Sequence, residues 1–176
     1  MAVEAVGTRK EEQLSMPRLE IGPLQSGQYT FPIAIEAPIE KVWRALFEDI
    51  NAWWLPDFHV VSTDSTMAFD PSPGGKGLHE QSGESGLLWY TVQCILTSEF
   101  KVYLVGYLAA DWGGPSISQL KLSLEKTNES SCVFKVSDAI IGSITEAQLV
   151  TIQNGWEKLF NEGLKPFIEA ETLSTS

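Results

Sequence analysis

The sequence of 176 residues predicts an α+β fold in which a curved, seven-stranded antiparallel sheet surrounds one long C-terminal helix. Two observations carry this prediction. Segments in which apolar and polar residues alternate follow one another with short connections, as in an antiparallel meander. The one long segment with apolar residues at helical spacing lies near the C-terminus, and it is the element available to cover one face of the sheet.

The first strand and two short helices are predicted at the start of the domain. Residues 29–36 alternate between apolar and polar side chains, and Pro32 is tolerated there if the strand lies at the edge of the sheet. Ala37-Pro38 then opens a helix, because proline suits the first helical turn. A second short helix is expected from residue 49 to about residue 55, where Pro56 ends it.

Six further strands are predicted after these helices. Residues 58–69 form an extended, β-branched segment, although the polar stretch at 62–65 can bulge or interrupt it. The run Pro71-Ser-Pro-Gly-Gly-Lys-Gly77 forces a turn. The other five strands are expected at about 77–81, 87–97, 101–109, 117–126 and 132–138.

The long C-terminal helix is predicted from Ser143 or Thr145, either of which can cap it, to Phe167. Gly163 and Pro166 predict a kink or a frayed turn near its end. Its apolar stripe consists of Leu149, Ile152, Trp156, Leu159, Phe160 and Phe167.

One domain accounts for most of the chain. Residues 1–26 show no sustained period and are expected to form a flexible N-terminal arm. The domain is expected to span residues 27–170 and a short tail residues 171–176. This length suits one domain better than two.

Composition and charge exclude several partners. The formal net charge is −11, and 12 basic residues are scattered among 23 acidic ones, which disfavours binding to nucleic acid or to anionic membranes. No apolar run is long enough to span a membrane, and the N-terminus lacks a secretory pattern. Cys94 and Cys132 have no metal-binding or redox spacing, so we expect a cytoplasmic protein with two reduced thiols.

Three runs of sequence resemble one known family. They are APIEKVWRALFEDINAWWLP at residues 37–56, FDPSPGGKG at 69–77 and NGWEKLFNEGLKPFIE at 154–169. Together they resemble the START/SRPBCC superfamily, in particular the group named after the activator of the heat-shock protein 90 ATPase. The resemblance implies the helix-grip fold, with a cavity between sheet and helix whose lining differs between members. It implies no shared catalytic residues, so it supplies no mechanism.

The strand order of that fold gives a test with the two cysteines. It places two strands between those that carry Cys94 and Cys132, a separation of roughly 14 Å at normal strand spacing. The resemblance therefore predicts that these cysteines do not form a disulfide.

The residues offer little sign of metal, phosphate or nucleophilic chemistry. The Gly-Gly-Lys-Gly run at 74–77 lacks the spacing of a phosphate-binding loop and is interpreted as a hairpin turn. His59 and His79 are the only histidines and have no metal-ligand companions, so no metal and no cofactor are expected. Asp138 shares its parity with Phe134 and Val136, so it either faces inward with a raised pKa or ends its strand in solvent.

An excess of aromatic side chains predicts the lining of a cavity, although the same side chains can simply fill a solid core. The loop at residues 111–115 can act as a gate to that cavity or as an ordinary turn. The predicted lining residues are Trp54, Phe58, Phe69, Trp89, Tyr107, Trp112, Asp138, Trp156 and Phe160.

The leading hypothesis is therefore a protein that binds a small hydrophobic or aromatic ligand between the sheet and the C-terminal helix, and that is noncatalytic or at most weakly catalytic. One alternative is a co-chaperone or protein-interaction module, in keeping with the family resemblance. Another is a cyclase, dehydratase or hydrolase that acts on a polyketide-like substrate by acid–base chemistry without a metal. A homodimer or a protein partner is left open.

Overall fold

The computed structural model describes residues 22–173. The predicted N-terminal arm therefore lies outside the described residues except for positions 22–26, of which Gln25 and Ser26 already belong to the first strand. At the other end, residues 171–173 of the predicted tail continue the last helix, and residues 174–176 lie outside the described range.

Seven antiparallel strands form one sheet, as the sequence predicted. Their spatial order is β1-β7-β6-β5-β4-β3-β2, so the first strand lies beside the last and the remaining neighbours follow the chain. The strands are β1 (Gln25–Ile35), β2 (Thr66–Asp70), β3 (Gly77–Ser82), β4 (Ser85–Leu96), β5 (Lys101–Leu108), β6 (Ser116–Asn128) and β7 (Ser131–Gly142).

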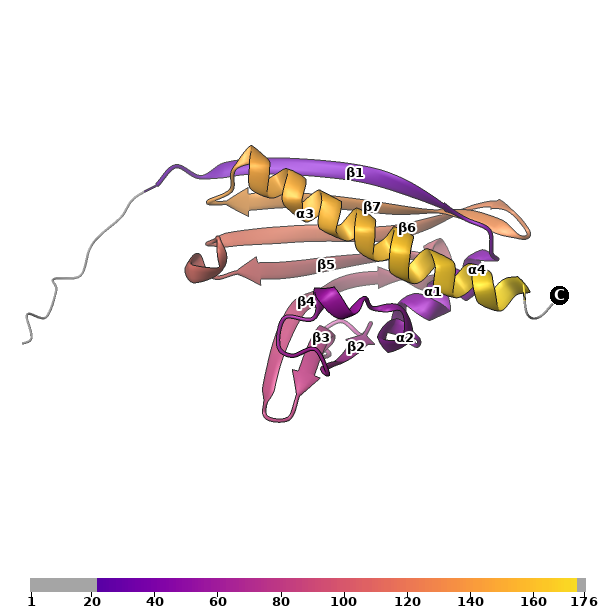
Figure 1. The fold of residues 1–176 in the computed structure, drawn as a ribbon. Coiled ribbons are helices and arrows are strands. Elements are labelled where there is room, and N and C mark those ends of the chain that lie inside the picture. The colour runs from indigo at the N-terminus through magenta and orange to yellow at the C-terminus, as the bar shows by residue number, and fades with distance from the viewer. Residues whose placement is uncertain (1–21, 174–176) are drawn as a thin grey trace, which may run out of the picture.

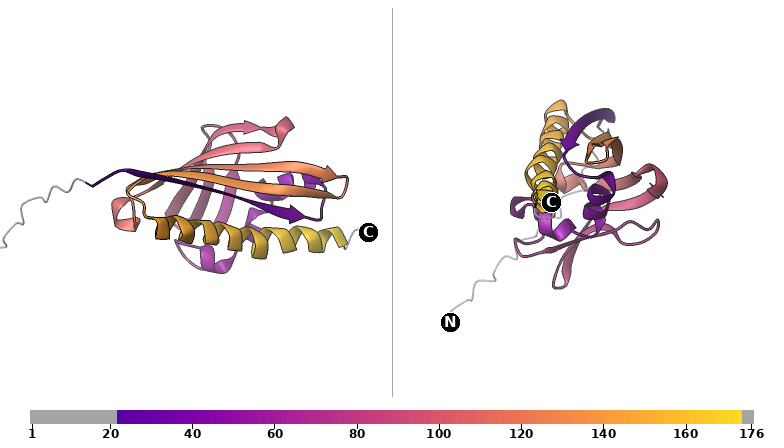
Figure 2. Two further views of the ribbon diagram at one scale, coloured as in Figure 1. Left: turned by 90° about the horizontal axis from the view of Figure 1, so that it is seen from above. Right: turned by 90° about the vertical axis from the view of Figure 1, so that its right-hand side faces the viewer.

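Two short helices, α1 (Ile39–Phe47) and α2 (Ile50–Trp53), connect β1 to the next part of the chain. The C-terminal helix consists of α3 (Glu146–Lys158), a π-helical segment (Leu159–Leu164) and α4 (Lys165–Leu173). It crosses the strands on one face of the sheet, with α3 beside β1 and α4 beside α1 (Figures 1 and 2). This arrangement confirms the predicted α+β plan.

The main core lies between this helix and the sheet. Phe160 in the π-helical segment packs edge to face against Phe134 of β7, with ring centroids 4.9 Å apart. Alternation along β6 buries Leu120, Leu122 and Leu124, as predicted. Ser123 departs from the pattern because it is also buried.

The extended strand predicted over residues 58–69 is wrong in its first half. Pro56–Phe58 form a 3₁₀ turn, and β2 begins only at Thr66. The backbone N–H groups of Val60 and Val61 donate to the carboxylate of Glu80 at 3.1 and 3.0 Å instead of to a neighbouring strand. A side chain thus replaces the strand ladder as the partner of this backbone.

The C-terminal helix begins as predicted but does not fray at Gly163 and Pro166. Thr145 caps it with a capping box in which its hydroxyl and Gln148 are reciprocally bonded. The π-helical segment includes Gly163, and the N–H of Lys165 donates to the carbonyl of Phe160. A Cβ at residue 163 would lie 2.3 Å from the carbonyl oxygen of Trp53, so glycine permits the close approach of α2.

Both cysteines are free thiols. Strands β6 and β5 lie between β7, which carries Cys132, and β4, which carries Cys94. The prediction that these residues do not form a disulfide is confirmed.

Candidate functional site

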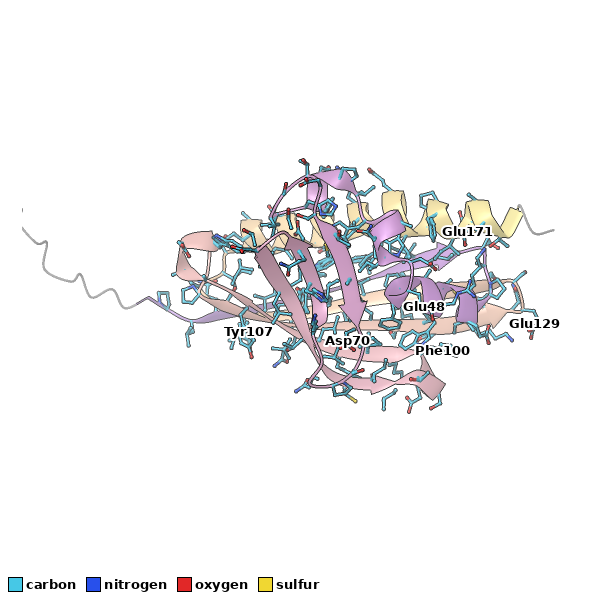
Figure 3. The ribbon with its side chains drawn as sticks, turned by 90° about the horizontal axis from the view of Figure 1, so that it is seen from below. Glu48, Asp70, Phe100, Tyr107, Glu129 and Glu171 are labelled. Carbon is cyan, nitrogen blue, oxygen red and sulfur yellow. The ribbon has the colours of Figure 1, made fainter. Side chains whose placement is uncertain are left out.

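A pocket of about 420 Å³ lies between α3, the segment from Trp54 to Val60, and strands β4 to β7. Tyr107, which lines the pocket, lies toward one end of the molecule, and Glu129 and Glu171 lie at the opposite end (Figure 3). Among residues 22–173, no charged side chain lines the pocket. It therefore suits an uncharged surface better than an ionic one.

Three tryptophans from distant parts of the chain form one wall of the pocket. The ring centroids of Trp54 and Trp89 are 5.5 Å apart. The centroid of Trp156 on α3 lies 6.4 Å from that of Trp54 and 6.5 Å from that of Trp89. The rings meet edge to face, the geometry that aromatic pairs prefer. The indole Nε1 of Trp54 is buried and has no hydrogen-bond partner among the described residues.

Trp89 reaches this wall because of an irregularity in the pairing of β3 with β4. Leu78 pairs with Tyr90, whereas His79 pairs with Leu88, so Trp89 is an extra residue between two register partners. Such a bulge turns an additional side chain toward one face of the sheet. Both Trp89 and Tyr90 consequently line the pocket.

A buried carboxylate holds the Trp54–Val60 segment against the sheet. Glu80 of β3 is 1% exposed and accepts hydrogen bonds from the N–H groups of Val60 and Val61. Trp89 Nε1 donates to it at 3.3 Å, and Nδ1 of His59 lies 3.3 Å from it. Glu80 thus connects the pocket wall at Val60 with the wall at Trp89.

These donors decide the charge of Glu80. Burial alone would raise the pKa of its carboxyl group, but the hydrogen bonds from the backbone of Val60 and Val61 outweigh burial and hold the pKa below its ordinary value. Glu80 is therefore ionised at neutral pH although it is enclosed. Its oxygens are satisfied within the protein and do not face the pocket.

Two of the residues that line the pocket, Tyr90 of β4 and Ser118 of β6, belong to a chain of hydrogen-bonded hydroxyl groups. Tyr90 Oη lies 3.0 Å from Ser118 Oγ, and both residues line the pocket. Ser118 Oγ donates to Asp138 at 2.7 Å, and Tyr29 Oη donates to the other carboxylate oxygen at 3.1 Å. The ring of Tyr90 crosses β5 at Gly106, where a Cβ would lie 2.8 Å from it.

Asp138 is 2% exposed and lies within β7, which continues to Gly142, so the inward orientation is the one adopted. Burial raises its pKa, and the hydrogen bonds from Ser118 and Tyr29 oppose this effect only in part. Burial and the nearby Asp138 carboxylate also raise the pKa values of Tyr29 and Tyr90, so both phenols remain protonated.

The rim of the pocket is apolar and exposed to solvent. Its side chains come from the segment before β2, from β4 and β5, and from the 3₁₀ turn at Ala110–Trp112. Between 39% and 67% of each of these side chains is exposed, which is unusual for large apolar groups that lie close together. They are Val60, Leu88, Tyr107, Leu108 and Trp112.

The nine residues proposed from the sequence fall into three places. Phe69 and Phe160 lie deeper in the core, around a void of only about 10 Å³. Asp138 lies behind Ser118 and does not line the pocket. The six that line the pocket are Trp54, Phe58, Trp89, Tyr107, Trp112 and Trp156.

Several residues of the site were missed in the sequence. Glu80 shares strand parity with the apolar Leu78, which was the available signal that it faces inward. Ser118 shares parity with Leu120 in the same way. Tyr90 gave no such signal, because the bulge at Trp89 interrupts the alternation of β4.

Within residues 22–173, no cluster of three or more His, Cys, Asp or Glu side chains could hold a metal ion. In the same range, none of the helices combines the length and the apolar character needed to cross a membrane.

No protein-family model matches the sequence, and no curated protein is significantly similar to it. Solved structures do match the fold. A point mutant of norcoclaurine synthase from Thalictrum flavum, solved with a transition-state analogue, is 11% identical with a TM-score of 0.56, covering 86% of this chain and 99% of that one. Ara h 8.0201 is 12% identical with a TM-score of 0.59, covering 82% of this chain and 98% of that one.

A protein from Mesorhizobium loti is 16% identical with a TM-score of 0.60, covering 82% of this chain and 98% of that one. These similarities confirm the helix-grip fold. At such low identity they establish the fold alone.

Proposed function

We propose that this protein binds a small apolar or aromatic molecule in the pocket between α3 and the sheet. The observation that carries the proposal is the pocket itself, which has a volume of about 420 Å³ and, in the described part of the chain, no charged side chain in its lining. Ligand pockets for small molecules typically measure about 300–1,000 Å³ and combine apolar walls with a few polar groups. The tryptophan wall supplies the apolar surface, and Tyr90 and Ser118 supply the polar groups.

The proposal can be tested by filling the pocket from the helix. Gly155 of α3 lines the pocket, and a Cβ there would meet only the ring of Phe58 at 3.8 Å. We expect Gly155→Leu to raise the Kd for the neutral fluorescent probe N-phenyl-1-naphthylamine at least about tenfold, because its side chain occupies the space of the ligand. Fluorescence titration measures the change.

Gly155→Ala is the matched control. It adds only a methyl group and should preserve probe binding, while it stabilises the helix by up to about 1 kcal/mol relative to glycine. If Gly155→Leu binds the probe as tightly as the unaltered protein does, the pocket is not the binding site. Native mass spectrometry of the protein purified from its own host would then identify the natural ligand class if one is retained.

Acid–base catalysis receives less support than binding. The titratable residues that line the pocket are Tyr90 and Tyr107, and the carboxyl group of Asp138 lies one hydroxyl away from it. A general acid or base must reach its substrate directly or through one water. The co-chaperone hypothesis rests on the family resemblance and on the strong negative net charge, which suits a basic surface, and it stays a prediction.

A further inference from the structure

A chain of hydrogen bonds crosses the sheet beside the pocket. It runs from Tyr90 on β4 to Ser118 on β6 at 3.0 Å, and from Ser118 to Asp138 on β7 at 2.7 Å. Tyr29 on β1 closes the far side of Asp138 at 3.1 Å. Tyr90 and Ser118 line the pocket, whereas Asp138 and Tyr29 do not.

The number of hydrogens in this chain decides what it can offer to a ligand. An ionised carboxylate only accepts, so Ser118 and Tyr29 both donate to Asp138. The single hydroxyl hydrogen of Ser118 is then donated to Asp138, so Ser118 accepts the hydrogen bond with Tyr90. The hydroxyl hydrogen of Tyr90 is therefore donated to Ser118. Only lone pairs then remain on the hydroxyl oxygens of Tyr90 and Ser118 for a ligand in the pocket.

We infer that Tyr90, Ser118 and Asp138 form a polar subsite that selects ligands with a hydrogen-bond donor, namely a flat apolar molecule with one N–H or O–H group. This inference rests on the proposed binding function, and it specifies that the preferred ligand carries a hydrogen-bond donor. Asp138 is a positioning residue, because it orients the hydroxyl of Ser118 without touching the ligand.

Protonation of Asp138 changes the polarity of the subsite. A protonated carboxyl group can donate to Ser118, after which Ser118 donates to Tyr90 and the hydrogen of Tyr90 points to the ligand. The titratable groups around Asp138 are Tyr29 of β1 and Tyr90 of β4, and Glu157 of α3 acts on Tyr29. No Lys, Arg or His of the described residues pairs with Asp138.

Three tricyclic probes of nearly the same shape test this inference. Carbazole has an N–H donor, fluorenone has a carbonyl acceptor, and fluorene has neither. None of them titrates between mildly acidic and mildly alkaline pH, so a change of preference with pH belongs to the protein. Equilibrium dialysis gives the three Kd values.

In mildly alkaline buffer we expect carbazole to bind about tenfold more tightly than fluorene, the effect of one hydrogen bond to Tyr90 or Ser118. In acidic buffer the advantage of carbazole should fall and fluorenone should gain. Asp138→Asn should abolish this pH dependence, because the amide keeps the shape of the side chain but does not titrate.

Two further variants separate the subsite from general effects on the pocket. Tyr90→Phe removes the last hydroxyl group and should reduce carbazole binding to the level of fluorene, with fluorene binding itself unchanged. Tyr103→Phe is the matched control, because Tyr103 does not line this pocket. It lines a second groove, which also includes Tyr29 and Asp138 but neither Tyr90 nor Ser118, and its substitution should leave all three Kd values unchanged.

If the unaltered protein binds the three probes equally at both pH values, the subsite inference is overturned while the proposed binding function stands. If Asp138→Asn keeps the pH dependence, Asp138 does not control the polarity and the inference is also overturned. If none of the probes binds, the proposed function itself fails, and the subsite fails with it.

Discussion

Glu80 is a buried charge that the fold uses as a structural anchor. A buried carboxylate costs free energy unless its oxygens accept hydrogen bonds. Here Val60, Val61 and Trp89 donate to it, and together they join an irregular segment to the sheet. The wall of the pocket therefore depends on one side chain that never contacts the ligand space.

We predict that Glu80→Gln lowers the free energy of unfolding by about 1–3 kcal/mol, because the amide is uncharged, keeps only one accepting oxygen and leaves the partly buried Nε1–H of Trp89 without its acceptor. Chemical denaturation followed by tryptophan fluorescence measures this loss. Glu84→Gln, in the exposed turn between β3 and β4, should change stability by less than about 0.5 kcal/mol.

The same anchor gives stability a defined dependence on pH. Because the pKa of Glu80 is lower in the folded protein than its ordinary value of 4.5, its contribution is present above that pH and is lost as the pH falls through the folded pKa. Glu80→Gln should therefore show a smaller loss of stability on acidification than the unaltered protein. An equal loss in both proteins would contradict the proposed anchoring role.

Among the secondary-structure elements, the C-terminal helix connects the core to the pocket. The π-helical segment turns Leu159, Phe160 and Leu164 into the core and brings Gly163 against α2. The preceding α3 has only Trp156 fully buried, and its other pocket residues, Ile152 and Gly155, are half-buried. The helix therefore depends on its N-terminal cap where packing is sparse.

We predict that Thr145→Ala destabilises the protein by about 1 kcal/mol, because it breaks the capping box with Gln148. Thr151→Ala is the control within the same helix, since Thr151 is exposed and alanine is a better helix former. Thermal denaturation followed by circular dichroism compares the two variants. A loss in Thr151→Ala as large as that in Thr145→Ala would show that capping is not the cause.

At the scale of the whole molecule, the reactivity of the buried Cys132 measures how often the protein unfolds. Burial, with smaller effects of Glu40 and Glu36, raises the pKa of its thiol to about 11. Cys94 is only half-buried. Because the thiolate is the reactive form, Cys132 requires unfolding before it can react.

We predict that iodoacetamide labels Cys94 in the native protein. Labelling of Cys132 should be limited either by the rate of unfolding or by the small population of unfolded molecules. Mass spectrometry of the labelled peptides distinguishes the two sites, and Cys94→Ser provides a protein with one thiol. Labelling of Cys132 at the same rate as Cys94 without denaturant would contradict the buried position of β7 in the core.

Much of the fold could be predicted from local patterns. Alternation placed Leu120, Leu122 and Leu124 in the core and predicted that Asp138 either faces inward or ends its strand. The cap at Thr145 followed from residue type and position. These features depend on interactions between residues that are close along the chain, so they can be predicted from the sequence.

The site was predictable only in part, because its members come from distant segments. Trp54, Trp89 and Trp156 were identified as aromatic candidates, but Phe69 and Phe160 have the same character and lie in the core. Residue type alone does not distinguish a wall from a filled interior. The irregular chain at Val60 was also predicted wrongly, since its partner Glu80 lies about 20 residues away.

The sequence by itself determined most of the strand and helix pattern, and the fold implied by its family resemblance predicted that Cys94 and Cys132 form no disulfide. Only the tertiary structure decided which aromatic side chains border empty space, and that Glu80 and Asp138 are both enclosed yet differ in pKa direction. The physical reason is that the state of a buried carboxyl group depends on its donors. Glu80 accepts from the backbone N–H groups of Val60 and Val61, and its donors outweigh its burial. Asp138 accepts from Ser118 and Tyr29 and from the backbone of Gln119 and Ala139, and these donors offset its burial only in part.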